Sequence, residues 1–462
     1  MRLTRVLPSF LFAALLLSAC GPGSPTLPST PDLPAVTETH ASPPTLTPTP
    51  TPSIGVDPAS LHGLSLQVWH AFAGPAYDVF TNQVAQFNAV NEWGILVKPT
   101  GCGDYTALFD AVNAALDSGQ TPELLASLPE QTLTWADSGA VVDLNPYLND
   151  PSWGLGKDAI ADIPSIFWAQ DNDDGKQLGL PAQRSARFLF YNETWAHELG
   201  FDSPPATADE FRQQACAANA SFRLDNDVTN DGKGGWVVDS HWQTIYSWLL
   251  AFGGSVTDGT DYRFRTDQNL ASLQFLKKMD TDYCAWPGET PYDSFAARSA
   301  LFVSGDLAEL SLEGDSMSRL KNADEWTVIL FPGPQTSTVV VYGPSYTLLK
   351  ATPEKQLASW LFARWLLTPE NQVQWVEATG LFPLRTSLLD MVGPYRAASP
   401  QWDAAVNALS LAQGVPPLAS WRKVRYVLED GMTVIFQTNT PVDQLPSVLA
   451  EVDAMAEELN KK

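Results

Sequence analysis

The sequence predicts an α/β protein of two lobes that follows an exported leader and an extended linker. From Gly63 onward, strand-like alternation and helix-like periodicity follow each other along the chain. About 400 residues follow the linker, which is too long for one ordinary core and typical of two lobes. The composition, 44% hydrophobic and 17% charged, is that of a globular protein.

The first twenty residues have the layout of a secretory signal. Arg2 and Arg5 precede an apolar run from Phe10 to Leu17, which is shorter than the roughly 20 residues that a spanning helix needs. Residues 17–20, Leu-Ser-Ala-Cys, are similar to the lipobox of bacterial lipoproteins, where cleavage leaves an acylated cysteine. We therefore expect a signal peptide over 1–20, acyl chains on Cys20 and an extracytoplasmic, membrane-anchored location. The alternative is an ordinary signal peptide with an incidental cysteine.

Residues 21–60 are rich in Pro, Ser and Thr and hold almost no large apolar side chain, so we expect an unfolded linker. In polyproline II geometry it could reach roughly 100 Å. The chain carries 27 Lys and Arg against 52 Asp and Glu, a formal charge of −25. This excess argues against nucleic acid or an anionic membrane surface as a partner. Membrane contact is therefore expected through the lipid anchor only.

The first folded segments alternate between strand and helix. "LSLQVW" (64–69) alternates like a strand, and residues 76–93 place Val79, Phe80, Val84, Phe87 and Val90 on one helical face. "GILVKP" (94–99) is a second strand, a helix over 105–119 ends at Gly119, and "ELLASLP" (123–129) is a short apolar run. This order predicts a lobe with a largely parallel sheet.

A second group of elements begins near Arg187. "RFLFYN" (187–192) is strand-like, and Thr207 with Glu210 forms a capping box before the next helix. Further helices are expected within 242–254 and 269–280. Two more are expected in series, the first capped by Thr352 and the second by Thr368, and Gly380 ends the second. Because strand character returns at 326–334 and 338–349, the chain is expected to cross between lobes more than once.

Three cysteines follow Cys20, and an exported protein lies where disulfides persist. We favour a disulfide between Cys216 and Cys284 with Cys102 free, although the other pairings stay open. No Cys or His spacing resembles a metal site, so no metal and no cofactor is expected. The acidic stretch 225–236 lacks the glutamate that ends a calcium loop, which favours a solvated turn.

Three blocks resemble extracellular solute-binding proteins of ABC importers, in the branch that binds sugars and glycerol 3-phosphate. They are "LQVWHAFAGPAYDVFTNQVAQFNAVN", "FLFYNETWAHELGFDSPPATADEF" and "LLTPENQVQWVEATGLFPLR", in the order expected for that family. The resemblance covers most of residues 63–455. It implies a monomeric binding protein, not an enzyme, that delivers a small solute to permease subunits.

The family's fold is the type II periplasmic-binding-protein fold, in which two lobes joined by a hinge close on a ligand. By this resemblance, residues 61–182 and about 308–345 would form one lobe, and residues 183–307 and about 346–462 the other. A secreted glycoside hydrolase is the alternative from another class, because it also needs carboxylates and aromatic side chains in a cleft.

Positions that match the family's motifs give the candidate ligand-binding residues. They are Tyr105, Glu130, Ser185, Trp242, Glu313, Gly343 and Arg425, with Trp248 as a further candidate. The structural alternatives for these residues are local packing, turn formation, a surface ion pair and, for Glu130, a favourable charge at a helix N-terminus.

Two departures from the family pattern bear on the ligand. Leu381 stands where the family has a tyrosine, and Glu313 and Gly314 replace hydroxyl residues. A carboxylate repels phosphate but accepts hydrogen bonds from sugar hydroxyls. A neutral carbohydrate is therefore expected, with glycerol 3-phosphate or its diesters as the alternative.

Overall fold

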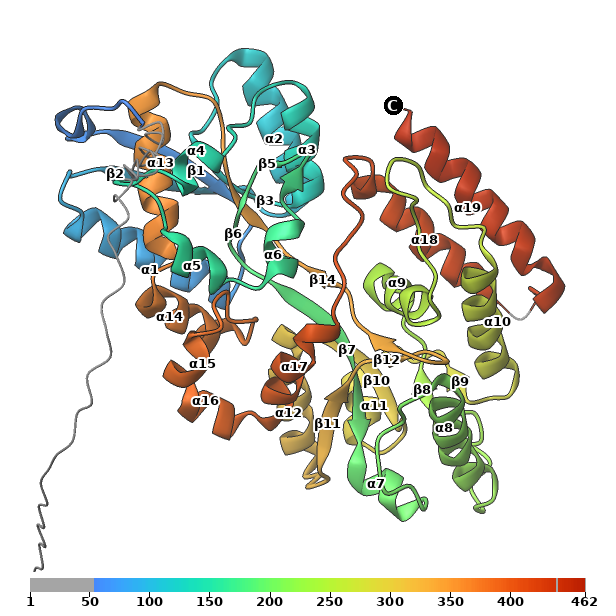
Figure 1. Cartoon of the computed structure of the whole chain (residues 1–462). Helices are drawn as coiled ribbons and strands as arrows, with labels where there is room; N and C mark the ends of the chain where they lie inside the picture. Colours follow the sequence, from blue (N-terminus) through green and yellow to red (C-terminus); the bar gives the residue numbers. More distant parts are fainter. Residues whose placement is uncertain (1–53, 438, 462) are drawn as a thin grey trace, which may run out of the picture. The chain divides into compact units, whose positions relative to one another are not determined.

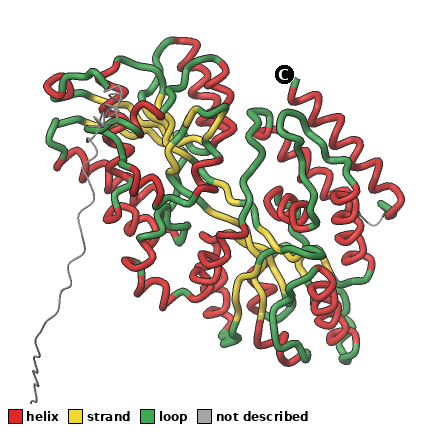
Figure 2. Tube along the Cα trace, viewed as in Figure 1, coloured by secondary structure: helices red, strands yellow, loops and turns green. Residues whose placement is uncertain are grey.

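Two β-sheets with helices packed around them organise the protein (Figures 1 and 2). The computed structural model describes residues 54–437 and 439–461, which lie in one compact unit. The leader with Cys20, and the linker as far as residue 53, lie outside the described residues.

The first lobe is built on a five-stranded sheet of order β2-β1-β3-β15-β6. Its strands are β1 (Ser65–His70), β2 (Leu96–Gly101), β3 (Leu124–Ser127), β6 (Leu180–Pro181) and β15 (Ser345–Leu348). β1 pairs in parallel with β2 and β3, whereas β15 is antiparallel to β3 and β6. The parallel sheet predicted from the alternation of patterns is therefore present, closed by an antiparallel return strand.

The helices of the first lobe cover this sheet and include two from late in the chain. They are α1 (Pro75–Val90), α2 (Tyr105–Ser118), α3 (Pro129–Asp137), α4 (Asn145–Leu148), α5 (Lys157–Ala161), α6 (Ser165–Ala169), α13 (Pro353–Leu366), α14 (Pro369–Thr379) and α15 (Leu388–Met391), with the 3-10 helix η1 (Pro58–Leu61). α1 buries Val79, Phe80, Val84 and Phe87 as predicted, but Val90 at its last turn is 68% exposed.

The second lobe is built on a sheet of order β11-β7-β10-β8-β9, with β14 also paired to β7. Its strands are β7 (Ser185–Asn192), β8 (Trp236–Val237), β9 (Ala285–Trp286), β10 (Phe302–Asp306), β11 (Trp326–Ile329) and β14 (Val341–Tyr342). Two small ribbons pair β4 (Asn172–Asp173) with β5 (Lys176–Gln177) and β12 (Phe331–Pro332) with β13 (Ser337–Thr338).

The helices of the second lobe pack around its sheet and on one another. They are α7 (Glu193–Glu198), α8 (Ala208–Arg223), α9 (Trp242–Ala251), α10 (Asp267–Thr281), α11 (Pro291–Ala296), α12 (Leu310–Leu320), α16 (Gly393–Ala398), α17 (Pro400–Ala408), α18 (Trp421–Ile435) and α19 (Leu445–Asn460), with η2 (Leu307–Glu309), η3 (Leu409–Leu411) and η4 (Val442–Gln444). Within the described residues, none of the helices combines the length and apolarity needed to cross a bilayer.

The predicted helix caps are largely present. The Thr207 hydroxyl accepts from the Glu210 amide while the Glu210 carboxylate accepts from the Thr207 amide, which completes the capping box. The Thr352 hydroxyl accepts from the amide of Lys355, but Thr368 occupies its cap position without a side-chain bond. Gly380 ends α14 in the left-handed conformation, as the sequence indicates.

The division of the chain between lobes differs from the prediction for the later segments. We expected residues 308–345 in the first lobe, but α12 packs on α11, and β11 and β14 pair with β7 of the second sheet. Conversely, α13 and α14 pack on β15 and α1 of the first lobe. The reason is that the chain returns to the first sheet only at Ser345, where β15 pairs with β3.

The linker also ends earlier than residue 60. The amide of Ile54 donates to the Asp150 carboxylate at 2.7 Å, and Leu61 at the end of η1 is fully buried. The folded part therefore includes at least residues 54–61.

A disulfide joins Cys216 of α8 to Cys284, 68 positions further along the chain, and Cys102 is free. The predicted pairing is confirmed. The bond ties α8 to the segment that leads from α10 into β9.

Candidate functional site

A cleft lies where the two lobes meet, and its inner part reaches the segments that join them. This inner part, the hinge compartment, has a volume of about 340 Å³. It is lined from the first lobe by Tyr105, Leu128, Pro129, Glu130 and Gln170, from the connecting segments by Gln183, Arg184, Ser185, Tyr342, Gly343, Pro344 and Leu381, and from the second lobe by His241, Trp242, Gln243, Asp306, Ala308, Val415, Trp421, Arg425, Tyr426 and Glu429.

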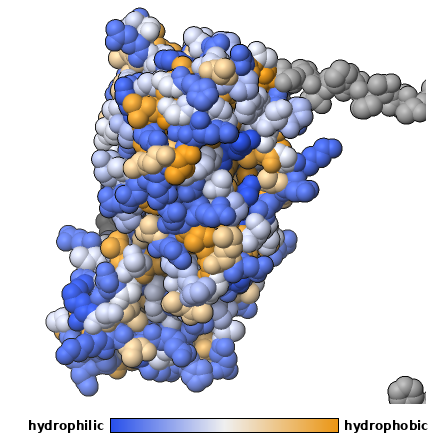
Figure 3. Space-filling model, turned by 90° about the vertical axis from the view of Figure 1, so that its left-hand side faces the viewer, coloured by the Kyte–Doolittle hydropathy of each residue, from blue (hydrophilic) through white to orange (hydrophobic). Residues whose placement is uncertain are grey.

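A second compartment of about 770 Å³ adjoins the first, with which it shares the lining residues Tyr105, Gln183, Ala308 and Leu381. Its other walls come from residues 71–76 and 377–380 of the first lobe and from α12, Trp326 and residues 395–402 of the second. In Figure 3, hydrophobic residues gather at mid-height, at the level between the upper and lower halves of the molecule. Both lobes therefore contribute walls to each compartment.

Six of the predicted ligand-binding residues line the hinge compartment: Tyr105, Glu130, Ser185, Trp242, Gly343 and Arg425. Each stands at an element boundary or on a helix that faces the cleft. Tyr105 begins α2, Glu130 lies in the first turn of α3, Ser185 begins β7 and Trp242 begins α9. In open α/β sheets, ligands bind where the ends of strands and helices meet in this way.

Arg425 and Glu130 are joined to each other across the cleft. The Arg425 Nη1 atom lies 2.6 Å from Glu130 Oε1, and the two side chains are 11% and 4% exposed. The guanidinium also lies over the rings of Tyr426 and Trp242, at 5.2 and 5.8 Å from their centres. The charge of Arg425 is therefore already compensated by a carboxylate of the opposite lobe.

A second arginine organises the carboxylates behind the pocket. Arg187 Nε lies 2.7 Å from Asp239, and its Nη1 lies 3.0 Å from Glu309 and 3.8 Å from Asp306. Burial acts to lower the pKa of Arg187, but these three carboxylates raise it overall. Asp306 accepts a hydrogen bond from the Tyr342 hydroxyl at 2.5 Å, and burial raises the pKa of its carboxyl to about 6.

Several residues that line the hinge compartment carry buried polar atoms without a hydrogen-bond partner. They are Gln170 Oε1, Gln183 Nε2, Arg184 Nε, Ser185 Oγ, Gln243 Oε1, Trp421 Nε1 and Arg425 Nε. Four of these atoms are donors, two are acceptors, and the Ser185 hydroxyl can be either. Buried polar atoms in native proteins are nearly always paired, so this group indicates a place for a ligand that both donates and accepts.

Gly343 has a structural reason to be glycine that the sequence did not reveal. Its φ is +148°, and a Cβ atom there would lie 2.3 Å from the carbonyl oxygen of Gln183. The two connecting segments can therefore pass this closely only because Gly343 has no side chain.

Two predicted site residues do not line the cleft. Trp248 is fully buried in the core of the second lobe, where it packs on Phe211, Phe275 and Phe331. Glu313 is also fully buried, on the face of α12 that carries Ser316 and Met317, whereas its neighbour Gly314 faces the second compartment. The helical period of 3.6 residues separates these two faces, and this corrects the prediction for Glu313.

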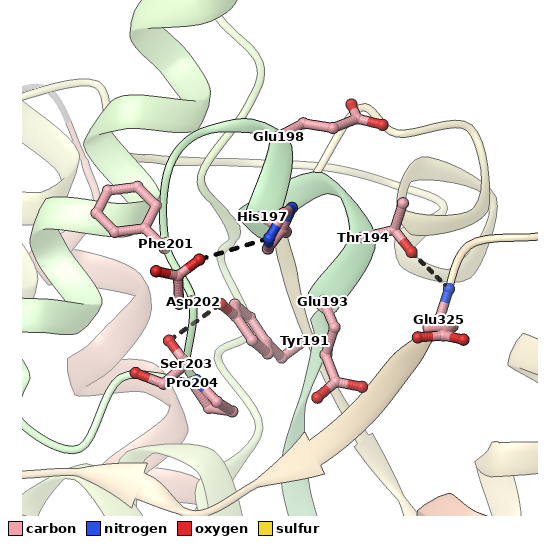
Figure 4. Close-up of a pocket in the computed structure, with 10 residues that line it drawn as sticks. All are labelled: Tyr191, Glu193, Thr194, His197, Glu198, Phe201, Asp202, Ser203, Pro204 and Glu325. Carbon is pink, nitrogen blue, oxygen red and sulfur yellow. Dashed lines mark hydrogen bonds and ion pairs between the residues drawn. The ribbon is translucent and has the colours of Figure 1, made fainter.

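Another hollow, of about 490 Å³, lies beside α7 in the second lobe (Figure 4). Its walls include Glu193, Glu198, Asp202 and Glu325, and His197 lies 3.5 Å from Asp202. Burial and the neighbouring Glu325 raise the pKa of Glu193. None of the described residues that line it carries a buried polar atom without a partner. The hollow therefore lacks the feature that marks the hinge compartment.

Comparison with known proteins decides the family. Residues 82–408 match the family of bacterial extracellular solute-binding proteins. The chain belongs to this family. It is 22% identical over 343 residues to the sn-glycerol-3-phosphate-binding periplasmic protein UgpB of Escherichia coli (strain K12), a match that covers 71% of this chain and 76% of UgpB.

Two solved structures show the same fold as this solute-binding protein. The sugar-binding protein MalE from Xanthomonas citri matches with a TM-score of 0.73 and 18% identity, over 86% of this chain and 97% of MalE. UgpB from Mycobacterium tuberculosis in complex with glycerophosphocholine matches with a TM-score of 0.69 and 16% identity, over 86% and 98%. The two-lobed fold is confirmed, and so is the prediction of an ABC importer's binding protein rather than a hydrolase.

Sequence reasoning missed several residues of this solute-binding protein's cleft. Trp421 lies four positions before Arg425 on α18, which places both on one helical face. That spacing was a usable signal. Gln183 and Gln243 had none, because a single glutamine in a connecting segment or at a helix start has no distinctive pattern.

The buried Glu313 makes the free energy of unfolding of the solute-binding protein depend on pH. Burial, with a smaller effect of Asp293, raises the pKa of Glu313 from 4.5 to about 8, and neither carboxyl oxygen has a hydrogen-bond partner. Because the unfolded chain ionises this group at lower pH, stability falls as pH rises from about 4.5 to about 8. We expect Glu313→Gln to be more stable than wild type by about 4 kcal/mol at pH 8, with no difference below pH 4.5.

Urea unfolding at a series of pH values measures this effect. The exposed Glu451 of α19 supplies a matched control, and Glu451→Gln should follow the wild-type curve. A constant offset between Glu313→Gln and wild type at all pH values would contradict the assignment.

Proposed function

We propose that the protein captures a neutral carbohydrate in the cleft between its lobes and passes it unaltered to the permease of its ABC importer. The observation that carries this proposal is the group of unpartnered donors and acceptors in the hinge compartment. A sugar hydroxyl both donates and accepts, whereas a phosphate only accepts at neutral pH. The mixed group therefore suits hydroxyls better than an anion.

The charges of the cleft support the same ligand class. The two arginines that line its described part are both paired: Arg425 with Glu130 at 2.6 Å, and Arg184 with Asp171 at 2.7 Å. Burial, and next the charge of Arg187, lower the pKa of His241. A phosphate would therefore meet compensated cations and the carboxylates of Glu130, Asp306 and Glu429.

The aromatic side chains supply the other contact that a sugar needs. Trp242 and Trp421 line the hinge compartment and pack edge to face, with ring centres 5.6 Å apart. Aromatic faces pack well on the apolar C–H faces of a sugar ring, with polar groups at the edges. The second candidate ligand is glycerol 3-phosphate or a diester of it, which the names of the two UgpB relatives favour.

Binding would act by shifting a population of lobe arrangements. A ligand in the hinge compartment touches α3 of the first lobe and α9 and α18 of the second, so its full contacts exist only when the lobes are close. Closure is then favoured by the difference in contacts between the open and closed forms. The permease would recognise the closed form of a monomer that is anchored through acylated Cys20.

Membrane fractionation tests this anchor. We expect the wild-type chain to leave the membrane fraction only when detergent is added, and Cys20→Ser to show no such dependence on detergent.

A thermal-shift screen over mono- and oligosaccharides, polyols, glycerol 3-phosphate and glycerophosphocholine tests the ligand class. We expect a neutral sugar at 100 times its Kd to stabilise the protein by about 2.7 kcal/mol. Chromatography of the bound sugar after release should return it chemically unchanged. Stabilisation by the phosphorylated compounds alone would overturn the carbohydrate, and a hydrolysed product would overturn the binding protein.

A further inference from the structure

The connecting segments of the two lobes meet at one buried side chain, Arg184. The first segment leads from β6 to β7, and the second leads from β14 back to β15 (Figure 1). The guanidinium of Arg184 is fully buried between them. A third segment, after α14, also reaches this point, because the amide of Phe382 donates to the carbonyl of Arg184 at 3.0 Å.

The hydrogen bonds of Arg184 reach both connecting segments. Its Nη1 donates to the carbonyls of Gln183, Gly343 and Pro344 at 2.8, 3.2 and 2.7 Å. Its Nη2 donates to the hydroxyl of Ser345 at 3.0 Å. An arginine presents five donors in a fixed planar fork, so one guanidinium can hold several acceptors in one geometry.

The same guanidinium is anchored to the first lobe. Nη2 donates to the carboxylate of Asp171 at 2.7 Å and to the carbonyl of Phe167 at 3.0 Å. Phe167 belongs to α6, and Asp171 also accepts from the Ser345 hydroxyl at 2.6 Å. Charge-assisted bonds of this kind are stronger than those between neutral groups.

Toward the second lobe, both connecting segments enter the second sheet at the residues directly next to Arg184 and Gly343. Ser185 pairs with Tyr342 and Ala186 pairs with Val341 in the β7–β14 ladder. Only the links Arg184–Ser185 and Tyr342–Gly343 separate the residues held by Arg184 from those held by this ladder. Gly343, with its φ of +148°, lies in one of these two links.

We infer that Arg184 is a positioning residue of the hinge: it fixes both connecting segments to the first lobe, so that within these two segments lobe rotation is confined to the Arg184–Ser185 and Tyr342–Gly343 links. Hinges in two-lobed proteins are a few residues that absorb the change in backbone angles. Because Gln183, Ser185, Tyr342 and Gly343 line the hinge compartment, a bound solute touches the links that move. The inference rests on the lobe closure of the proposed function, but not on the identity of the solute.

The distance between the lobes in the solute-free protein tests the inference. Spin labels on V90C of α1 and L224C after α8, in a C102S background that keeps the disulfide, report this distance by pulsed electron resonance. Val90 and Leu224 are 68% and 85% exposed and lie in different lobes. We expect Arg184→Lys to widen the distance distribution by about twofold or more, because lysine keeps the charge but cannot fork between the segments.

Two further variants separate positioning from ordinary stability. Leu108→Ala removes a fully buried side chain of the first lobe and should destabilise by about 2–5 kcal/mol without widening the distribution. Ser345→Ala removes one acceptor of Arg184 and should widen the distribution less than Arg184→Lys, and it decides the matter if Arg184→Lys does not fold. If folded Arg184→Lys shows the wild-type distribution of distances between the spin labels, the inference is overturned. If Arg184→Lys is unfolded, the same result in Ser345→Ala overturns it. A failed sugar screen together with a widened distribution would instead overturn the proposed function alone.

Discussion

Arg425→Ala is expected to weaken solute binding at least tenfold. The substitution removes the guanidinium whose Nε has no partner in the hinge compartment, and it leaves the Glu130 carboxylate, 4% exposed, without its cation. Truncating one member of a buried, hydrogen-bonded charge pair costs about 2–5 kcal/mol in comparable interfaces. A tenfold loss corresponds to about 1.4 kcal/mol, so the lower limit is conservative. Isothermal calorimetry with the sugar that stabilises most strongly in the thermal-shift screen measures it.

Two controls separate the contact from the charge. Arg263 is 65% exposed in the same lobe, with Asp258 at 3.6 Å, and Arg263→Ala should leave the affinity unchanged. The double variant Arg425→Ala/Glu130→Gln removes the buried charge that the single variant strands. If the double variant binds the sugar with wild-type affinity, Arg425 serves only to neutralise Glu130. We expect the affinity to recover at most partly, because the guanidinium also donates hydrogen bonds to the solute. Unchanged affinity in Arg425→Ala would remove this residue from the site.

The local elements of the first lobe could be predicted because each has its own signal. The alternation of Leu64, Leu66 and Val68 marks β1, and the spacing of Val79, Phe80, Val84 and Phe87 marks α1. Hydrophobic period and capping chemistry act over a few residues, so they can be read from sequence alone. The same holds for the capping box at Thr207.

The allocation of later segments to lobes could not be predicted from such signals. Val341 and Tyr342 pair with residues more than 150 positions earlier in the chain, and β14 has only two residues. Nothing local distinguishes a short strand that pairs with β7 from one that pairs with β3. The error over residues 308–345 follows from this, because partner choice in a sheet is a long-range property.

The site shows the same limit at the scale of single side chains. Glu130 and Arg425 could be selected because they match positions in the family's motifs. No local pattern indicated that they bind each other across the cleft. Glu313 was misplaced by one residue of helical phase, since Gly314 faces the second compartment and Glu313 the interior. The orphaned amides of Gln183 and Gln243 could be found only in three dimensions.

Removing the disulfide should lower the stability of the protein strongly. The double variant Cys216→Ser/Cys284→Ser opens a cross-link between residues 68 positions apart. Closing a loop of this length limits the conformations of the unfolded chain, which corresponds to about 4 kcal/mol in the chain-entropy model. Serine in the buried position of Cys284, which is 1% exposed, adds a cost of its own in the folded state.

Equilibrium unfolding in guanidinium chloride under oxidising conditions measures this loss as a lower midpoint. Cys102→Ser is the matched control, because Cys102 is the free, partly exposed thiol, and its free energy of unfolding should stay within about 0.5 kcal/mol of wild type. Neither disulfide cysteine lines the cleft, so the affinity for the selected sugar should survive at temperatures where the variant is folded. A midpoint equal to that of wild type would show that the bond contributes nothing, whereas lost binding in the folded variant would show that the cross-link also shapes the second lobe's wall of the cleft.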